Sequence, residues 1–298
     1  MGCRWAASGR GTVIVVGRST SSLGVAMGSH HEFEAQLENF RHEASVAAQY
    51  LYSDMAVQYA ASKSKKLLNR LNDTPSFWLA HSAASQCAAY VSLGRVFDTT
   101  SDYNIDALLN AFESHLDIFA KEALAIRKTE GLSRDPKWLP EYLAKAHYPT
   151  VRDVLRLRKK VAEYRAVYDR AVKPARHKYL AHREKVDRDE VRKLFGRGKV
   201  RELWRLVTFL HSLHEALWNQ LHNGQKPVLR ARRFSVGRIY EADHHGSAPH
   251  ERIVADTKKL MTSIEASTPN NAFERSGKHG GPRIARHNNR RPAAQLNR

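Results

Sequence analysis

Apolar residues recur at intervals of three and four positions over most of the chain between residues 32 and 222. This spacing places them on one face of an α-helix. The first stripe predicts a helix of about eight turns, and its members are Phe33, Leu37, Phe40, Ala44, Ala47, Leu51 and Met55. A second helix is predicted from Thr74, a good N-cap followed by Pro75, to about Phe97.

The middle of the chain predicts shorter helices and then a long one. Residues 105–128 indicate a short helix and a longer one, and residues 131–148 indicate a proline-rich connection with one short helix. Thr150 with Asp153 three positions later resembles a capping box, which starts the next long helix. Pro174 falls late in that helix, where it should kink or restart the backbone.

Two further helices complete the pattern. Asp187 caps a short helix that closes near Gly196, and a long helix follows at residues 199–222 until Asn223 and Gly224 end it. The only run suited to a strand is TVIVV at residues 12–16. The sequence therefore predicts an all-α fold, an up-and-down bundle of four to five long helices with disordered termini.

The two ends of the chain lack this periodicity. Residues 1–30 are rich in Gly and Ser and predict a disordered extension, and translation is expected to begin at Met27. Residues 31–233 form the predicted bundle. Residues 234–298 are polar and broken by Pro and Gly, so we expect a mostly disordered basic tail with one short helix near residues 252–265.

Composition excludes several classes of protein. Of the 298 residues 42% are hydrophobic, which is too many for a wholly disordered chain. The two cysteines, Cys3 and Cys87, exclude a disulfide scaffold and suit a reducing cytosol. No apolar run approaches the roughly 20 residues of a membrane span. We therefore expect a cytoplasmic protein with no membrane partner.

The net charge of +19 is unevenly distributed. Residues 1–148 hold 15 basic and 15 acidic side chains, residues 149–233 hold 23 and 9, and residues 234–298 hold 11 and 6. A positive surface of this kind attracts the phosphates of nucleic acids. The alternative is that long exposed helices carry Arg and Lys for solubility.

Sixteen histidines raise the question of a metal, but their spacing does not favour one. His211 and His214 lie one turn apart, with His222 further along, and no Cys or carboxylate stands beside them at ligand spacing. The Asp243-His244-His245 run has no evident third ligand. The pair His30-His31 follows Met-Gly-Ser and could be a cloning remnant. Walker A, GxGxxG and GxSxG motifs are missing from the sequence, so we expect no metal and no cofactor.

One segment carries a recognisable motif. Residues 175–184 read ARHKYLAHRE, with five residues between Arg176 and His182. Together with residues 93–98 (LGRVFD) and the closing ELWRLVTFLHSLHEALWNQL, this segment resembles the HEPN superfamily, in its AbiU-like abortive-infection branch. The resemblance covers about residues 32–233. It implies a dimeric endoribonuclease in which Arg176 and His182 are catalytic and both subunits contribute to one cleft.

Physical chemistry supports these roles. An imidazole can donate or accept a proton near neutral pH, and a guanidinium stays charged and grips phosphate oxygens. In an unbroken helix Arg176 and His182 would lie about 120° apart and roughly 9 Å along the axis, so a two-fold dimer would bring the two residue types together. His177 and Lys178 are candidate supporting residues. Arg183, Arg192 and Arg201 are candidate RNA contacts.

Three hypotheses follow. The first is a metal-independent endoribonuclease, acting in phage defence or as a toxin, with RNA as substrate and an antitoxin protein as a further candidate partner. The second is a non-catalytic module of the same fold that binds RNA or protein. The third is a helical scaffold whose basic face serves solubility alone. In that case Arg176 and Lys178 are solvated, Tyr179 and Leu180 belong to the core, and His182 interacts with a helix end. Some HEPN toxins are modified on a Tyr two residues after the His, but here that residue is Glu184. Arg95 and Asp98 are expected to form an internal ion pair.

Overall fold

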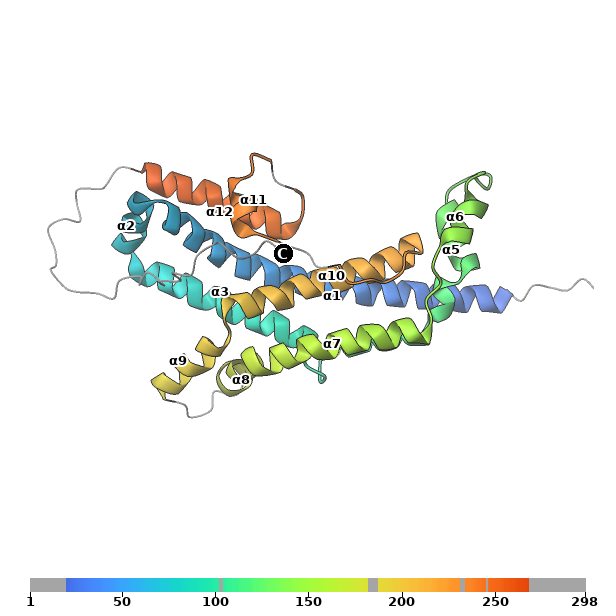
Figure 1. Ribbon diagram of the computed structural model, residues 1–298, viewed down its shortest axis with the longest axis horizontal. Coiled ribbons are helices and arrows are strands. Elements are labelled where there is room, and N and C mark those ends of the chain that lie inside the picture. Colours follow the sequence, from blue (N-terminus) through green and yellow to red (C-terminus); the bar gives the residue numbers. More distant parts are fainter. Residues whose placement is uncertain (1–19, 102–103, 182–186, 231–233, 245, 268–298) are drawn as a thin grey trace, which may run out of the picture.

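The computed structural model describes residues 20–101, 104–181, 187–230, 234–244 and 246–267, and throughout these ranges the chain is helical or irregular, without a strand (Figure 1). This confirms the all-α class. The described part contains twelve α-helices, so four to five is an undercount. The difference lies in the short helices, since seven of the twelve have ten residues or fewer.

The α-helices that shape the bundle are α1 (Thr20–Lys63), α2 (Lys65–Asp73), α3 (Pro75–Phe97), α4 (Ile105–Ser114), α5 (Lys121–Thr129), α6 (Leu139–Lys145), α7 (Val151–Ala171), α8 (Lys173–Ala175), α9 (Arg188–Arg197), α10 (Val200–Asn223), α11 (Val236–Glu241) and α12 (Pro249–Ala266). A 3-10 turn spans Leu116–Phe119 and a π-helix spans Arg176–Ala181.

Helix α1 is the central element. It has 44 residues and begins at Thr20, twelve residues before the expected start. Helices α3, α10 and α12 pack along it (Figure 1). The predicted stripe is buried from Phe33 to Leu51. Because α1 contacts helices from both halves of the chain, both halves contribute to the main hydrophobic cluster around it.

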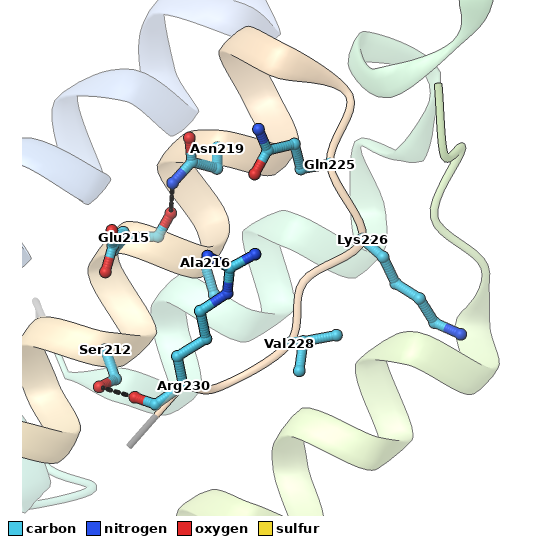
Figure 2. A pocket seen from close by; sticks show the side chains of 8 residues that line it. All are labelled: Ser212, Glu215, Ala216, Asn219, Gln225, Lys226, Val228 and Arg230. Carbon is cyan, nitrogen blue, oxygen red and sulfur yellow. Dashed lines mark hydrogen bonds between the residues drawn. The ribbon is translucent and has the colours of Figure 1, made fainter. Parts of the chain in front are cut away.

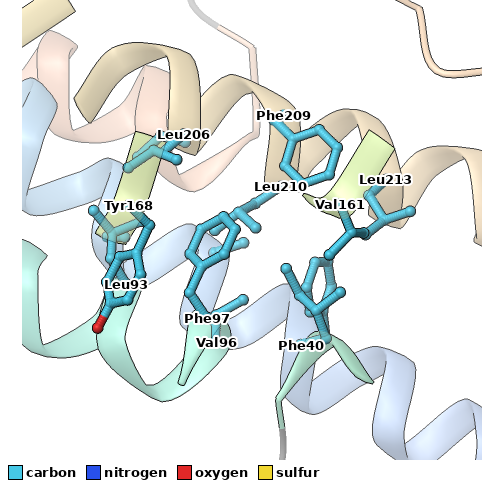
Figure 3. Close-up of a cluster of buried hydrophobic side chains, with 14 of the residues drawn as sticks. Phe40, Leu93, Val96, Phe97, Val161, Tyr168, Leu206, Phe209, Leu210 and Leu213 are labelled. Carbon is cyan, nitrogen blue, oxygen red and sulfur yellow. The ribbon is translucent and has the colours of Figure 1, made fainter. Parts of the chain in front are cut away.

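Aromatic side chains connect α3, α7 and α10 inside this core (Figure 3). The rings of Tyr164 and Phe209 stack with their centroids 3.9 Å apart. Phe97 stacks on Tyr168 at 5.2 Å. The first contact joins α7 to α10, and the second holds the end of α3 against the last turn of α7, just before the motif at residues 175–184.

Local signals at helix ends match the structure closely. Thr150 and Asp153 form a complete capping box at the start of α7. Gly224 ends α10 in the left-handed conformation, with φ of 57°. Pro75 occupies the first turn of α3 as expected, but the side chain of Thr74, the expected N-cap, makes no capping hydrogen bond.

The segment after residue 233 differs from the expected tail. Helices α11 and α12 pack on α1, and α12 includes the short helix expected near residues 252–265. Val254 and Met261 are fully buried. Residues 234–267 are therefore largely folded. Residues 1–19 and 268–298, the outer parts of the two segments expected to be disordered, lie outside the described ranges.

None of the helices that the structure describes combines the length and the apolar character that a membrane span requires.

Candidate functional site

The backbone changes form where the motif begins. Helix α7 ends at Ala171, and Pro174 lies within the short helix α8. Pro174 cannot donate a backbone hydrogen bond, so the expected restart of the helix is confirmed. The π-helix Arg176–Ala181 follows directly. A π-helix uses wider i→i+5 turns, is rare, and is often found at functional sites. The sequence did not predict it.

Arg176 lies against the carboxyl-terminal end of α3. Its guanidinium forms an ion pair with Asp98, whose side chain is only 7% exposed. The Tyr168 hydroxyl donates a hydrogen bond to the other carboxylate oxygen of Asp98, with 3.0 Å between the oxygens. A charged carboxylate is costly to bury without such partners. Asp98 therefore holds Arg176 in a fixed position between α3 and α7.

Gly94 makes this approach feasible. A Cβ atom placed at Gly94 would overlap the Arg176 side chain and would lie 2.7 Å from its Cζ atom. Because Gly94 lies one turn before Asp98, the glycine leaves space for the guanidinium to cross the helix. The LGRVFD segment thus supplies both the space and the charge that position Arg176.

A second arginine stands close to the first. Burial lowers the pKa of Arg176, and the positive charge of Arg95 lowers it further. Arg95 itself forms an ion pair with Glu43 on α1 at 3.1 Å. The expected internal pair between Arg95 and Asp98 is therefore wrong, because each pairs with a residue of another helix. Arg95 is a candidate site residue that the sequence indicated only through the LGRVFD wording.

The two supporting candidates have different neighbours. The Nε2 atom of His177 lies 3.6 Å from the Asp98 carboxylate, so His177 belongs to the Arg176 group. Lys178 is exposed, and its Nζ atom lies 3.6 Å from Oε1 of Glu190 on α9. The structure thus brings Arg176, His177 and Asp98 together, while Lys178 points to α9.

Helix α9 covers one side of the π-helix through aromatic contacts. Phe195 stacks on Tyr90 of α3 with ring centroids 5.6 Å apart. The Tyr179 ring contacts the Phe195 ring edge to face, with ring centroids 5.5 Å apart. These contacts anchor the π-helix to α3 and α9 at once, so the position of Arg176 does not depend on its ion pair alone.

The remaining candidate residues are either exposed or outside the described part of the chain. His182, Arg183 and Glu184 lie outside the described residues. Arg192 is 79% exposed and pairs with Asp189 on its own helix at 3.0 Å. Arg201 is exposed in the first turn of α10. The structure does not join Arg192 to the Arg176 group.

A small hollow lies elsewhere, between α10 and the chain that follows it (Figure 2). Its walls are mainly polar; they are formed by Ser212, Glu215, Ala216, Asn219, Gln225, Lys226, Val228 and Arg230. The Ser212 hydroxyl closes one side by donating to the Arg230 carbonyl at 2.7 Å. None of the candidate residues of the motif lines this hollow.

The Arg176 group has the elements of an anion site. The guanidinium of Arg176 is held near a second arginine, Arg95. The Asp98 carboxylate balances part of their positive charge. The imidazole of His177 is partly exposed next to them. Such an arrangement can hold a phosphate and present an imidazole to it.

Comparison with protein-family models matches residues 31–239 of the chain to the family described as AbiU2, within the HEPN group. Neither the curated proteins nor the solved structures contain a match to the chain.

Proposed function

Because the chain belongs to the AbiU2 family of HEPN proteins, we propose that it is a metal-independent endoribonuclease of an abortive-infection or toxin–antitoxin system in the cytoplasm. The position of Arg176 carries this proposal. Its guanidinium is anchored by Asp98 at the start of the Arg-x5-His motif, on a π-helix. A charge fixed in this way needs no rearrangement when a phosphate arrives.

In this reaction the 2′-hydroxyl of a ribose attacks the adjacent phosphorus, and the bond to the 5′-oxygen of the next nucleotide breaks. One imidazole takes the proton of the 2′-hydroxyl, and another group returns a proton to the 5′-oxygen. His182 is proposed for one of these roles, and Arg176 stabilises the charged phosphorane. The products carry a 2′,3′-cyclic phosphate and a 5′-hydroxyl.

The site is proposed to form in a homodimer, with an Arg and a His from each motif in one cleft. A mixed dimer, made of one subunit of each of two inactive variants, tests this directly. Arg176→Ala and His182→Ala should each abolish cleavage as homodimers. If one cleft uses both subunits, the co-expressed mixed dimer regains part of the activity, since one Arg and one His remain intact.

The central assay is RNA cleavage in EDTA with analysis of the product ends. Wild type should cut, and Arg176→Ala and His182→Ala should lose at least about a hundredfold in rate, the typical value of one acid–base or electrostatic contact. Arg41→Ala is the matched control, because Arg41 is exposed on α1 and pairs with Glu38 of the same helix. Undiminished cleavage by His182→Ala would refute the assignment.

A second candidate function is RNA or protein binding without cleavage. The ion pair between Arg176 and Asp98 is the observation that favours it, since a paired guanidinium can serve structure alone. RNA cleavage and RNA binding by wild type and by Asp98→Asn distinguish the two candidate functions. If Arg176 is catalytic, wild type cleaves RNA, and Asp98→Asn lowers the cleavage rate more than it lowers RNA affinity. If Arg176 is structural, wild type binds RNA and produces no new RNA ends.

A further inference from the structure

A second cluster of chemically active side chains lies at the opposite end of the bundle. His30, His31 and Glu34 occupy about one turn and a half of α1, and Arg127 of α5 lies near them. One ligand atom of each lies within 4.8 Å of the others. Three groups of this kind at this spacing are suited to a metal ion.

Helix α10 contributes a fourth group. The Nε2 atom of His222 lies 3.6 Å from Oε1 of Glu34. The Nδ1 atom of His30 lies 3.9 Å from Oε2 of the same carboxylate. In a tetrahedral zinc site with bonds of 2.0–2.1 Å, neighbouring ligand atoms are about 3.3 Å apart. The two separations that involve Glu34 are a few tenths of an ångström longer than this. Only the atoms of His30, His31 and Glu34 all lie within 4.8 Å of one another, so the His222 side chain has to move toward the other two imidazoles to complete the site.

One ring nitrogen of the cluster is available to a metal. The Nε2 atom of His30 is buried and makes no hydrogen bond within the described part of the chain. An imidazole nitrogen of this kind can offer its lone pair to a metal ion.

Arg127 is the group that opposes a cation here. Its guanidinium lies near Glu34 and both partly buried histidines, and it donates a hydrogen bond to the Ile118 carbonyl at 2.8 Å. It compensates the charge of Glu34 when the cluster is empty. A divalent ion has to compete with this charge, so the site selects metals that form strong bonds to nitrogen.

We propose that His30, His31, Glu34 and His222 bind a zinc-class divalent transition metal and thereby fasten the first part of α1 to the end of α10. Three imidazoles and one carboxylate match the donors preferred by zinc. Four protein ligands leave no open coordination position, so the role is structural. The proposal does not rest on the endoribonuclease, which needs no metal.

The experiment uses the full chain without any added histidine tag, freed of metal by dialysis. Titration with Zn²⁺ alone, followed by calorimetry, should show one ion per chain and a higher unfolding temperature, which EDTA reverses. Mg²⁺ should cause neither effect, because it prefers oxygen ligands. Co²⁺ should give the visible absorption of a tetrahedral site.

Variants identify the ligands. Glu34→Gln and His222→Gln should each weaken Zn²⁺ binding roughly a hundredfold or more, at least the loss caused by removing an outer-shell partner. His42→Gln on the exposed side of α1 is the control and should bind as wild type. His31→Gln tests the cluster through an exposed residue, should either buried-side variant fail to fold.

Binding of equal strength in wild type, Glu34→Gln and His222→Gln would overturn the proposal, as would the lack of stoichiometric binding by wild type. RNA cleavage is measured in parallel. Cleavage that persists in EDTA while the unfolding temperature falls supports both proposals. Loss of cleavage in EDTA contradicts the endoribonuclease proposal and leaves the zinc titration to decide the metal site.

Discussion

Gly94 is the residue on which the placement of Arg176 depends most directly. A methyl group there would overlap the Arg176 side chain. We expect Gly94→Ala to displace the guanidinium from Asp98 and to destabilise the protein by about 1–3 kcal/mol, the usual cost of overpacking. Chemical denaturation measures this. If the proposed function holds, the cleavage rate falls as well.

Gly196 supplies the control for this substitution. It also lies in a helix, but a Cβ atom there would meet no atom within 4 Å. Gly196→Ala should stabilise the protein by up to about 1 kcal/mol through helix propensity. Equal stabilisation by both substitutions would show that the Arg176 side chain moves aside without cost.

His214 should make stability dependent on pH. Burial and the charge of Arg41 together lower its pKa to about 4, against the opposing charges of Glu38 and Glu215. The unfolded chain binds a proton near pH 6.5, while the folded chain does so only near pH 4. His214 thus disfavours folding progressively as the pH falls from about 6.5 to 4, by on the order of 3 kcal/mol.

Denaturation of wild type and His214→Gln between pH 7 and pH 4.5 checks this. The variant should lose less stability over this interval, since glutamine has no proton to gain. Parallel curves for the two proteins would mean that His214 takes up its proton at the same pH in the folded and the unfolded chain.

At the scale of elements, the start of α7 is the best defined junction. The Asp153 carboxylate accepts hydrogen bonds from the Thr150 amide at 3.0 Å and from His147, and it pairs with Arg156. Burial alone would raise the pKa of Asp153, but these hydrogen bonds together hold it below its ordinary value. The ionised Asp153 carboxylate therefore stabilises the fold fully above about pH 4, and this stabilisation is lost as the pH falls further.

Asp153→Ala should destabilise the protein by about 1–3 kcal/mol, since it removes a cap and leaves buried donors unpaired. Thermal unfolding at pH 7 measures the change. Asp189→Ala is the comparison, because Asp189 is exposed and its pair with Arg192 contributes little. A similar effect of both substitutions would contradict the capping role.

Elements with strong local signals could be predicted from the sequence. The capping box before α7, Pro75 in α3 and Gly224 after α10 each act through a few neighbouring residues. The burial of α12 depends instead on its contact with α1, and its apolar positions are sparse. The π-helix is equally invisible, because Pro174 predicts a break in the helix but not the form in which it resumes.

The candidate site was predictable only in part for the same reason. Arg176 and His177 were identified from a motif that lies within ten residues of sequence. Asp98, Arg95 and Gly94 lie some 80 residues earlier, and only the packing of α3 against α7 brings them together. Their pairing depends on side-chain geometry that periodicity does not specify, which is why Arg95 and Asp98 were expected to pair with each other.

At the scale of the whole molecule, the structure changes the meaning of the basic charge. Residues 149–233 hold 23 basic side chains, but several of these are ion-paired. Besides Arg176–Asp98, the pairs include Arg156–Asp153, Arg158–Glu113, Arg165–Asp106, Arg170–Glu202 and Arg192–Asp189. Residues 268–298 hold seven basic side chains and one acidic side chain, a net charge of 7 − 1 = +6. Residues 268–298 therefore contain far fewer acidic side chains, relative to basic ones, to neutralise their positive charge.

Removal of residues 268–298 should therefore weaken RNA binding at low salt and reduce its salt dependence. For single-stranded RNA, seven lost phosphate contacts would lower the slope of log K against log salt by up to about 5. Binding measured over a salt series with the His182→Ala variant, with and without these residues, tests this. The cleavage rate of saturating RNA should stay unchanged, because Arg176 and Asp98 remain. An unchanged salt slope would place the RNA contacts on the bundle itself.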